Sequence, residues 1–150
     1  MPICIFEREM TDAEYARELE GFREHALEFG IPDIPETRHG FVAMEGEVFI
    51  GSVSGLLYNK WFYITDLWLE KPYRKRGHGI ELVRKMEDKA EQLGVKHIWT
   101  WTAGYEAAPF YQKCGYAIFC EFEDYYPTGH SRIGLYKQLS RGLPDALGPL

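Results

Sequence analysis

The chain has 150 residues and a net charge of −6, with 45% hydrophobic and 27% charged residues. This length suits one domain with one core, and the composition is ordinary for a soluble globular protein. The acidic balance argues against a general affinity for DNA, RNA or anionic membranes, because their phosphates attract Lys and Arg. We therefore expect neither nucleic acid nor a membrane as a partner.

The cysteines and histidines form no pattern typical of a disulfide framework or a metal site. The three cysteines stand far apart without a CxxC pair, and the five histidines show neither HxxxH nor HExxH spacing. No signal-like segment opens the chain, and no apolar run is long enough to span a bilayer. We expect a metal-free cytoplasmic protein, either a monomer or a homodimer.

The N-terminal half of the chain predicts one strand, one helix and then three strands. Residues 2–8 are apolar-rich and typical of a strand. Thr11 and Glu14 have the spacing of a helix capping box, and apolar residues then recur at helical spacing. The next strands are predicted at residues 40–45, 48–58 and 61–69. The strand at 61–69 is almost entirely aromatic or β-branched, which is typical of a buried central strand. In the strand at 48–58, Gly51 and Gly55 mark expected bulges or close approaches.

The C-terminal half predicts two helices, one more strand and a final hairpin. The clearest element is an amphipathic helix from Ile80 to Leu93, followed by Gly94, a residue suited to a helix end. The other elements are a strand at 95–102, a short helix at 107–113 and hairpin strands at 116–126 and 133–139. Residues 140–150 lack periodicity and are expected to form an irregular tail. Elements in this order indicate an α/β (α+β) fold, a mixed sheet with helices on its faces.

The most informative segment is the turn at residues 74–79, Arg-Lys-Arg-Gly-His-Gly, which joins a predicted strand to the amphipathic helix. The first backbone N–H groups of a helix are unpaired and favour an anion. Gly77 and Gly79 carry no side chain that would keep a pyrophosphate from the backbone. Four basic side chains stand nearby: Lys71, Arg74, Lys75 and Arg76. The plainer alternative is a tight turn with a solvated basic face, and the pattern matches neither a P-loop nor a dinucleotide-binding GxGxxG turn.

Two segments together resemble the GNAT acetyltransferase family. Residues 74–79 match its [QR]-x-x-G-x-[GA] turn, and residues 107–116, Ala-Ala-Pro-Phe-Tyr-Gln-Lys-Cys-Gly-Tyr, resemble its A-x-x-F-Y-x-K-x-G-[FY] segment. Residues 66–69 look like the family's central strand. The resemblance implies a GNAT-like, mostly antiparallel seven-stranded sheet with splayed central strands and flanking helices. It covers residues 1–139, which we expect to form a single acetyltransferase domain.

The resemblance also implies acetyl-CoA as the co-substrate and indicates where it binds. The pyrophosphate would sit on the amides of the glycine turn, and the pantetheine arm would pair with the backbone of the central strand. The N–H of Leu69 would face the thioester oxygen, where negative charge develops as an amine attacks. The residues implied at the acetyl-CoA site are Leu67, Trp68, Leu69, Arg74, Lys75, Arg76, Gly77, His78, Gly79 and Ile80.

Three side chains are implied in catalysis. Asp66, which interrupts an apolar strand, is the first candidate for accepting the proton of the amine, and Glu70 is the second. The alternative for Asp66 is a hydrogen-bonded carboxylate that holds the strand, and water is the alternative base. Tyr111 occupies the family's general-acid position, where it would protonate the departing thiolate. Without the resemblance, Tyr111 would be read as a core aromatic residue.

The function implied is transfer of an acetyl group from acetyl-CoA to a primary amine. The predicted first helix, the loop after it and the last hairpin are rich in acidic residues, which favours a small cationic acceptor, such as an antibiotic-like amine. One alternative is acetylation of a protein or peptide amine. Another is a catalytically degenerate acyl-CoA-binding regulatory domain, because Gly104 stands where many family members have Asn. The turn at residues 129–132 either reaches the acceptor pocket or is an ordinary hairpin loop, so the role of His130 stays open.

Overall fold

The computed structural model describes residues 1–139, which divide between Pro35 and Glu36 into two compact units. The first unit contains one helix, α1 (Asp12–Glu28), and the second contains a sheet with its own helices. The predicted irregular tail at residues 140–150 lies outside the described residues. The single domain expected over residues 1–139 stays a prediction.

Helix α1 begins at the predicted capping box. The Thr11 hydroxyl accepts a hydrogen bond from the Glu14 N–H at 3.3 Å, and the Glu14 carboxylate accepts one from the Thr11 N–H at 2.8 Å. Arg8 forms an ion pair of 2.7 Å with the same carboxylate, and Arg8 and Thr11 together lower the pKa of Glu14 to about 2. The predicted strand at residues 2–8 is wrong, because no strand forms in residues 1–11. An extended segment becomes a strand only by pairing its backbone, and none of the described strands pairs with it.

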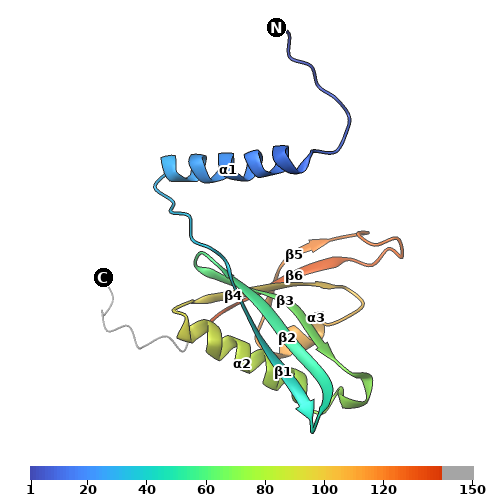
Figure 1. Cartoon of the computed structure of the whole chain (residues 1–150). Helices are drawn as coiled ribbons and strands as arrows, with labels where there is room; N and C mark the ends of the chain where they lie inside the picture. The colour runs from blue at the N-terminus through green and yellow to red at the C-terminus, as the bar shows by residue number, and fades with distance from the viewer. Residues whose placement is uncertain (140–150) are drawn as a thin grey trace, which may run out of the picture. The chain divides into compact units, whose positions relative to one another are not determined.

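The second unit is built on one sheet of six strands (Figure 1). Their order across the sheet is β1-β2-β3-β4-β6-β5, and only the neighbours β3 and β4 run parallel. In chain order the strands are β1 (Thr37–Glu45), β2 (Val48–Tyr58), β3 (Trp61–Leu69), β4 (His97–Ala103), β5 (Ala117–Phe122) and β6 (Arg132–Gln138). A mixed, mostly antiparallel sheet with flanking helices confirms the predicted fold class, with six described strands instead of seven.

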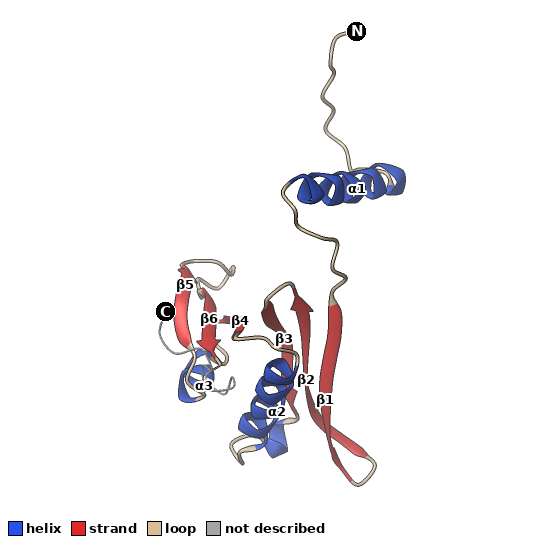
Figure 2. Cartoon of the chain, turned by 90° about the vertical axis from the view of Figure 1, so that its left-hand side faces the viewer, coloured by secondary structure: helices blue, strands red, loops and turns tan. Residues whose placement is uncertain are grey.

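One face of the sheet carries the hydrophobic core under two helices. Helix α2 (His78–Gln92) lies against β1, β2 and β3, and α3 (Ala108–Lys113) lies against β5 and β6 (Figure 2). The helical repeat of α2 buries Val83 and Met86, which join strand residues such as Phe62 in one core cluster. The amphipathic helix predicted from the sequence is therefore confirmed.

Two glycines in β2 allow the neighbouring strand to approach closely, as predicted. A Cβ on Gly51 would lie 2.5 Å from the carbonyl oxygen of Trp68, and a Cβ on Gly55 would overlap the Phe62 ring. The register between β2 and β3 shifts at Gly55, so Thr65 of β3 has no partner on β2. This bulge bends β3 in its middle.

The other face of the sheet is lined with aromatic side chains. Tyr63 of β3 stacks on Trp99 of β4, with 4.4 Å between the ring centroids. The prediction that residues 61–69 form a buried strand is wrong for this face, because Trp61 and Trp68 are exposed. Only the residues of β3 that face the helices are buried, so the aromatic composition of the strand reflects an aromatic surface as well as a core.

A partly buried ion pair joins α2 to β6 on the helix-covered face. The Lys137 ammonium lies 3.1 Å from both carboxylate oxygens of Glu87 and donates to the Cys114 carbonyl at 2.8 Å. The two side chains are only 27% and 12% exposed. Charges that are this far removed from water are stable together, whereas removing one leaves the other uncompensated.

We expect Lys137→Met to lower the free energy of unfolding by about 3 kcal/mol, because the Glu87 carboxylate loses its cation. The double variant Lys137→Met/Glu87→Leu removes both charges and should recover most of that loss. Denaturant unfolding followed by circular dichroism compares the three proteins. An equal loss in the single and the double variant would show that the unpaired carboxylate is not the cause.

Candidate active site

The candidate site begins where β3 and β4 stop pairing. Their parallel pairing ends at Ile64 and Thr100. Beyond that point β3 stays paired with β2 as far as Leu69, and β4 stays paired with β6 as far as Ala103. The Thr100 hydroxyl donates to the Ile64 carbonyl at 3.0 Å and closes the last paired step. The splayed central strands expected from the sequence are therefore β3 and β4.

The unpaired edge of β3 offers backbone donors. The Glu70 N–H donates to the Ile50 carbonyl at 2.8 Å, so Glu70 directs its backbone toward β2. Because successive residues of an antiparallel strand alternate in direction, Leu67 and Leu69 turn their N–H groups toward the unpaired side. An extended ligand with amide groups can pair with such an edge as an added strand does. This is the arrangement that the predicted pantetheine contacts of Leu67 and Leu69 require, whereas the backbone of Trp68 is turned toward β2.

The glycine turn follows β3 through a short 3-10 helix, η1 (Lys71–Tyr73), and opens α2. Gly77 is the N-cap residue with a φ of +89°, a left-handed conformation that favours glycine, and nothing lies within 4 Å of a Cβ built there. The first helical bond runs from the Glu81 N–H to the Gly77 carbonyl at 3.1 Å. The N–H groups between them belong to His78, Gly79 and Ile80. They lack partners within the helix, and with the helix dipole they favour an anion.

The two glycines of this turn have different surroundings. A Cβ on Gly79 would lie 3.2 Å from the Phe110 ring and 3.4 Å from Leu69, so this glycine lets α2 start close to α3 and β3. Gly77, in contrast, leaves the outer side of the turn open. In the sequence the two residues look equivalent, and only the packing distinguishes the open glycine, Gly77, from the interior one, Gly79.

The basic side chains of the turn have no acidic partners within the described residues. Arg74, Lys75 and Arg76 are exposed, and none of them forms an ion pair with any of the residues 1–139. The Arg74 Nε donates to the Leu69 carbonyl at 2.9 Å, and its guanidinium lies 4.8 Å from the centroid of the Trp68 ring. Uncompensated cations beside open amide groups suit a pyrophosphate.

Tyr111 of α3 lies buried beside the end of the β3–β4 pairing. Its side chain is 3% exposed, and its ring packs edge-on against Tyr116 at 5.3 Å. Burial raises the pKa of Tyr111 to about 12; a hydrogen bond with Thr100 opposes this rise, and the charges of Glu106 and Asp66 add to it. The hydroxyl is therefore a protonated donor at neutral pH. Tyr111 is thus a core aromatic residue whose hydroxyl nonetheless reaches the point where the strands part.

The two candidate bases differ in their surroundings. Asp66 is exposed, and its carboxylate has neither a hydrogen bond nor an ion pair within the described part of the chain. The alternative that Asp66 holds the strand through hydrogen bonds thus finds no support. The Glu70 carboxylate accepts a bond of 3.3 Å from the Trp68 indole. Because Leu67 and Leu69 pack toward the core, the alternating Asp66 and Trp68 lie on the aromatic face.

The Gly104 backbone is in direct contact with the β5–β6 hairpin. The Gly104 N–H donates to the Ser131 carbonyl at 2.6 Å, and a Cβ on Gly104 would lie 3.1 Å from that oxygen. A larger residue here would press on the hairpin backbone. The glycine at the usual Asn position therefore has a packing reason, and it does not by itself indicate a lost activity.

Two polar residues near Tyr111 carry no signal in the sequence. Thr100 belongs to an ordinary alternating strand pattern, in which threonine is common. Glu106 falls in the β4–α3 connection, where its carboxylate accepts a bond of 3.4 Å from the Thr102 hydroxyl. In the folded structure both residues lie close enough to Tyr111 to shift the pKa of its hydroxyl.

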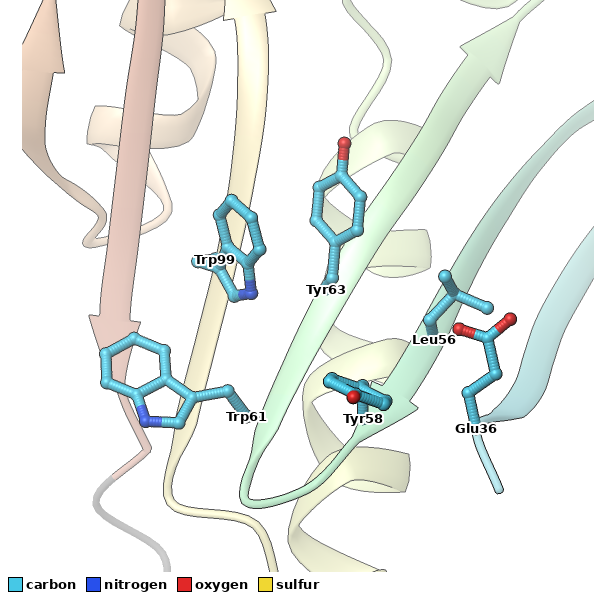
Figure 3. A pocket seen from close by; sticks show the side chains of 6 residues that line it. All are labelled: Glu36, Leu56, Tyr58, Trp61, Tyr63 and Trp99. Atoms are coloured by element: carbon cyan, nitrogen blue, oxygen red, sulfur yellow. The ribbon is translucent and has the colours of Figure 1, made fainter. Parts of the chain in front are cut away.

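The aromatic face forms an open pocket of about 450 Å³ (Figure 3). It is lined by Glu36, Leu56, Tyr58, Trp61, Tyr63 and Trp99. Figure 3 shows the rings of Tyr63 and Trp99 side by side on neighbouring strands, in the stretch where β3 and β4 are still paired. The pocket thus precedes the point where the two strands diverge.

No group of three or more His, Cys, Asp or Glu side chains within residues 1–139 is placed to hold a metal ion. The cysteines Cys4, Cys114 and Cys120 are free thiols. None of the helices described in this structure is long and apolar enough to cross a membrane.

Comparison with known protein families matches residues 5–116 to the acetyltransferase (GNAT) family. The chain belongs to this family. The resemblance carried by the two motifs is thereby confirmed, and so is the class of protein that they predicted. GNAT proteins are acetyltransferases that use acetyl-CoA, as expected from the sequence.

Two curated relatives align with about three fifths of the chain. A blasticidin-S acetyltransferase from Streptomyces morookaense is 30% identical over 92 residues, and an L-ornithine N5-acetyltransferase from Arabidopsis thaliana is 28% identical over 93 residues. Each alignment covers 59% of this chain, with 65% of the Streptomyces protein and 40% of the Arabidopsis protein. The chain thus spans only part of the length of both relatives.

Solved structures show the same fold. An acetyltransferase from Bacillus cereus superposes with a TM-score of 0.80 and 25% identity, covering 90% of this chain and 98% of that chain. A streptothricin acetyltransferase from Bacillus anthracis, solved with acetyl coenzyme A, has a TM-score of 0.62 and 24% identity, covering 71% and 64%. The fold of a GNAT acetyltransferase is therefore shared over most of the chain.

We expect Gly77→Glu to abolish measurable binding of acetyl-CoA, because it places a bulky negative charge where the pyrophosphate would meet the turn. The matched control is Gly94→Glu, since Gly94 also has a positive φ, of +80°, and also has nothing within 4 Å of a Cβ. Both variants place a side chain at a left-handed φ and add the same charge. Calorimetric titration with CoA should give wild-type affinity for Gly94→Glu only; equal affinity in both variants would exclude the turn as the pyrophosphate site.

Proposed function

We propose that this chain transfers the acetyl group of acetyl-CoA to the primary amine of a small molecule. The observation that carries the proposal is the position of Tyr111, a buried hydroxyl that stays protonated beside the end of the β3–β4 pairing. The open backbone amides of β3 and of the glycine turn would bind the thioester co-substrate, and the exposed Asp66 carboxylate would receive the amine.

The co-substrate binds through three groups of contacts in this proposal. The pyrophosphate meets the amides of residues 78–80 and the cations of the turn. The pantetheine arm pairs with the free edge of β3. The N–H of Leu69 then donates to the thioester oxygen, which becomes negative as the carbonyl carbon is attacked.

The chemistry needs one proton acceptor and one proton donor. The amine must lose its proton before it attacks, and Asp66 takes this proton directly or through water, with Glu70 as the second candidate. The neutral amine forms a C–N bond with the acetyl carbon, and the C–S bond breaks. The Tyr111 hydroxyl gives its proton to the departing thiolate, and the resulting phenolate recovers a proton from solvent or from the attacking amine. The products are an acetamide and CoA.

The names of the relatives support a small acceptor. Blasticidin-S and L-ornithine are the substrates named for the two curated relatives, and an aminoglycoside 6′-N-acetyltransferase is among the structures of the same fold, with a TM-score of 0.64. Release of CoA in the presence of a panel of amines, with mass spectrometry of the acetylated product, tests the proposal. Binding of acetyl-CoA without turnover of any small amine or peptide would instead favour a regulatory acyl-CoA-binding domain.

We expect Tyr111→Phe to lower kcat by about 10²- to 10⁴-fold while CoA affinity stays nearly unchanged, because the hydroxyl acts on the leaving group in the transition state. Tyr116→Phe is the matched control. Tyr116 is also 3% exposed, and its ring packs against the ring of Tyr111, so this variant removes a buried hydroxyl at a neighbouring position. Steady-state kinetics should separate the two variants, and a Tyr111→Phe enzyme within about twofold of wild type would leave Tyr111 with a packing role only.

We expect Asp66→Asn to lower kcat/KM by about 10²-fold at pH 7, with a deficit that shrinks toward pH 10. The reason is that the acceptor amine loses its proton to solvent as the pH rises, so the carboxylate is needed less. A pKa of about 12 keeps Tyr111 protonated over this whole range, since its acid form is lost only as the pH passes that value. The profile therefore reports the base alone. Glu70→Gln tests the second candidate base, for which the same pH-dependent deficit would then be seen, and wild-type profiles in both variants would assign the proton transfer to water.

A further inference from the structure

Arg132, the first residue of β6, is held in place between aromatic rings. Its guanidinium carbon lies 5.6 Å from the centroid of the Trp101 ring and 5.5 Å from that of Tyr125. The Arg132 Nη1 also donates to the Tyr126 hydroxyl at 3.3 Å. These contacts fix the orientation of the guanidinium and reduce the entropy that it would lose on binding a ligand.

The charge of Arg132 has no acidic partner in the part of the chain that the structure describes. The side chain is half-buried, yet no carboxylate in the described residues forms an ion pair with it. Lys137 of the same strand makes the contrast clear, because it faces the helices and is paired with Glu87. A guanidinium has five N–H donors in a planar fork, and the Tyr126 hydroxyl uses one. The remaining donors suit a planar anion such as a carboxylate.

Arg132 lies on the same face of the sheet as Asp66. The residues that follow it at alternating positions, Ile133 and Leu135, belong to the core, so Arg132 projects to the aromatic face. In the sheet Arg132 stands opposite Ala103 of β4, and β4 separates β6 from β3. Two strand spacings put the backbones of Asp66 and Arg132 at least about 10 Å apart. Two side chains and a small molecule several bonds long can bridge that span.

We propose that Arg132 binds a carboxylate of the acceptor, so that the substrate class is an amine that also carries a carboxylate, as an amino acid does. This inference rests on the proposed acetyl transfer. Asp66 receives the amine end, and Arg132 receives the acid end one strand beyond β4. The acidic composition of the chain favours the cationic amine end of such an acceptor, whereas Arg132 would bind its anionic carboxylate end.

The competing explanation is that Arg132 only clamps the β5–β6 hairpin through its two aromatic contacts. A clamp affects every acceptor equally, because it acts on the shape of the site. A carboxylate-binding residue affects only acceptors that carry the acid. Matched pairs of amines that differ by one carboxylate separate the two explanations.

The experiment uses L-lysine against cadaverine, and 4-aminobutyrate against propylamine, with the full chain and acetyl-CoA. In the wild-type protein, the carboxylate-bearing member of a pair should have a kcat/KM roughly 10- to 100-fold higher, as expected for a hydrogen bond between charged groups. Arg132→Met keeps an apolar stem over Trp101 and removes the charge, and it should bring this ratio close to one. Arg132→Lys retains the charge without the fork and should give an intermediate ratio.

Calorimetric binding of the same four amines to the CoA-bound protein gives a readout that does not depend on turnover. Equal affinity or equal kcat/KM within both pairs of the wild-type protein overturns the proposal, and so does an Arg132→Met variant with an unchanged ratio. Tyr126→Phe serves as the clamp control, because it removes the hydroxyl contact and should leave most of the ratio in place. Failure of the acetyl transfer itself would be seen separately, as acetyl-CoA that binds but is not consumed with any amine.

Discussion

The site depends on one set of hydrogen bonds that is not made, the one between β3 and β4 after Ile64 and Thr100. Each of these strands keeps its outer partner, so the sheet stays intact while an interior edge opens. Backbone groups freed inside a fold need partners, and a ligand that is itself rich in amides can supply them. The bulge at Thr65 and the hydroxyl of Thr100 lie at the point of separation, where they bend one strand and hold the other.

The two faces of the sheet differ in the side chains that they carry and in their proposed roles. On the helix-covered face the apolar residues form the core, and the half-buried Lys137 is paired with Glu87. On the aromatic face, Asp66 and Arg132 carry charges of opposite sign without acidic or basic partners in the described residues. In the proposed reaction the co-substrate enters through the opened edge and the acceptor lies on the aromatic face. The sheet then separates the two substrates except where its central strands part.

Local patterns in the sequence were sufficient to predict most helices and strands and to recognise the family. Strands β2 and β3 occur at the predicted bounds, because a turn at each end limits an alternating or aromatic run. Residues 2–8 had the composition of a strand but pair with none of the described strands, and pairing is a property of the whole fold. The same limit applies to the site. The glycine turn is local and was recognised, whereas the neighbours of Gly79 and the position of Thr100 beside Tyr111 arise from contacts between distant parts of the sequence.

The missing side chain of Gly79 determines how closely α2 can begin to α3. Gly79 belongs to the turn proposed to hold the pyrophosphate, and Phe110 precedes the proposed acid, Tyr111, on α3. A Cβ on Gly79 would lie only 3.2 Å from the Phe110 ring and 3.4 Å from Leu69 of β3, so the start of α2 can lie this close to both only without a side chain at residue 79. In the proposed site, packed protein atoms therefore set the spacing between the pyrophosphate turn and the proton donor, and a co-substrate with a longer or shorter arm would place its thioester away from the Tyr111 hydroxyl.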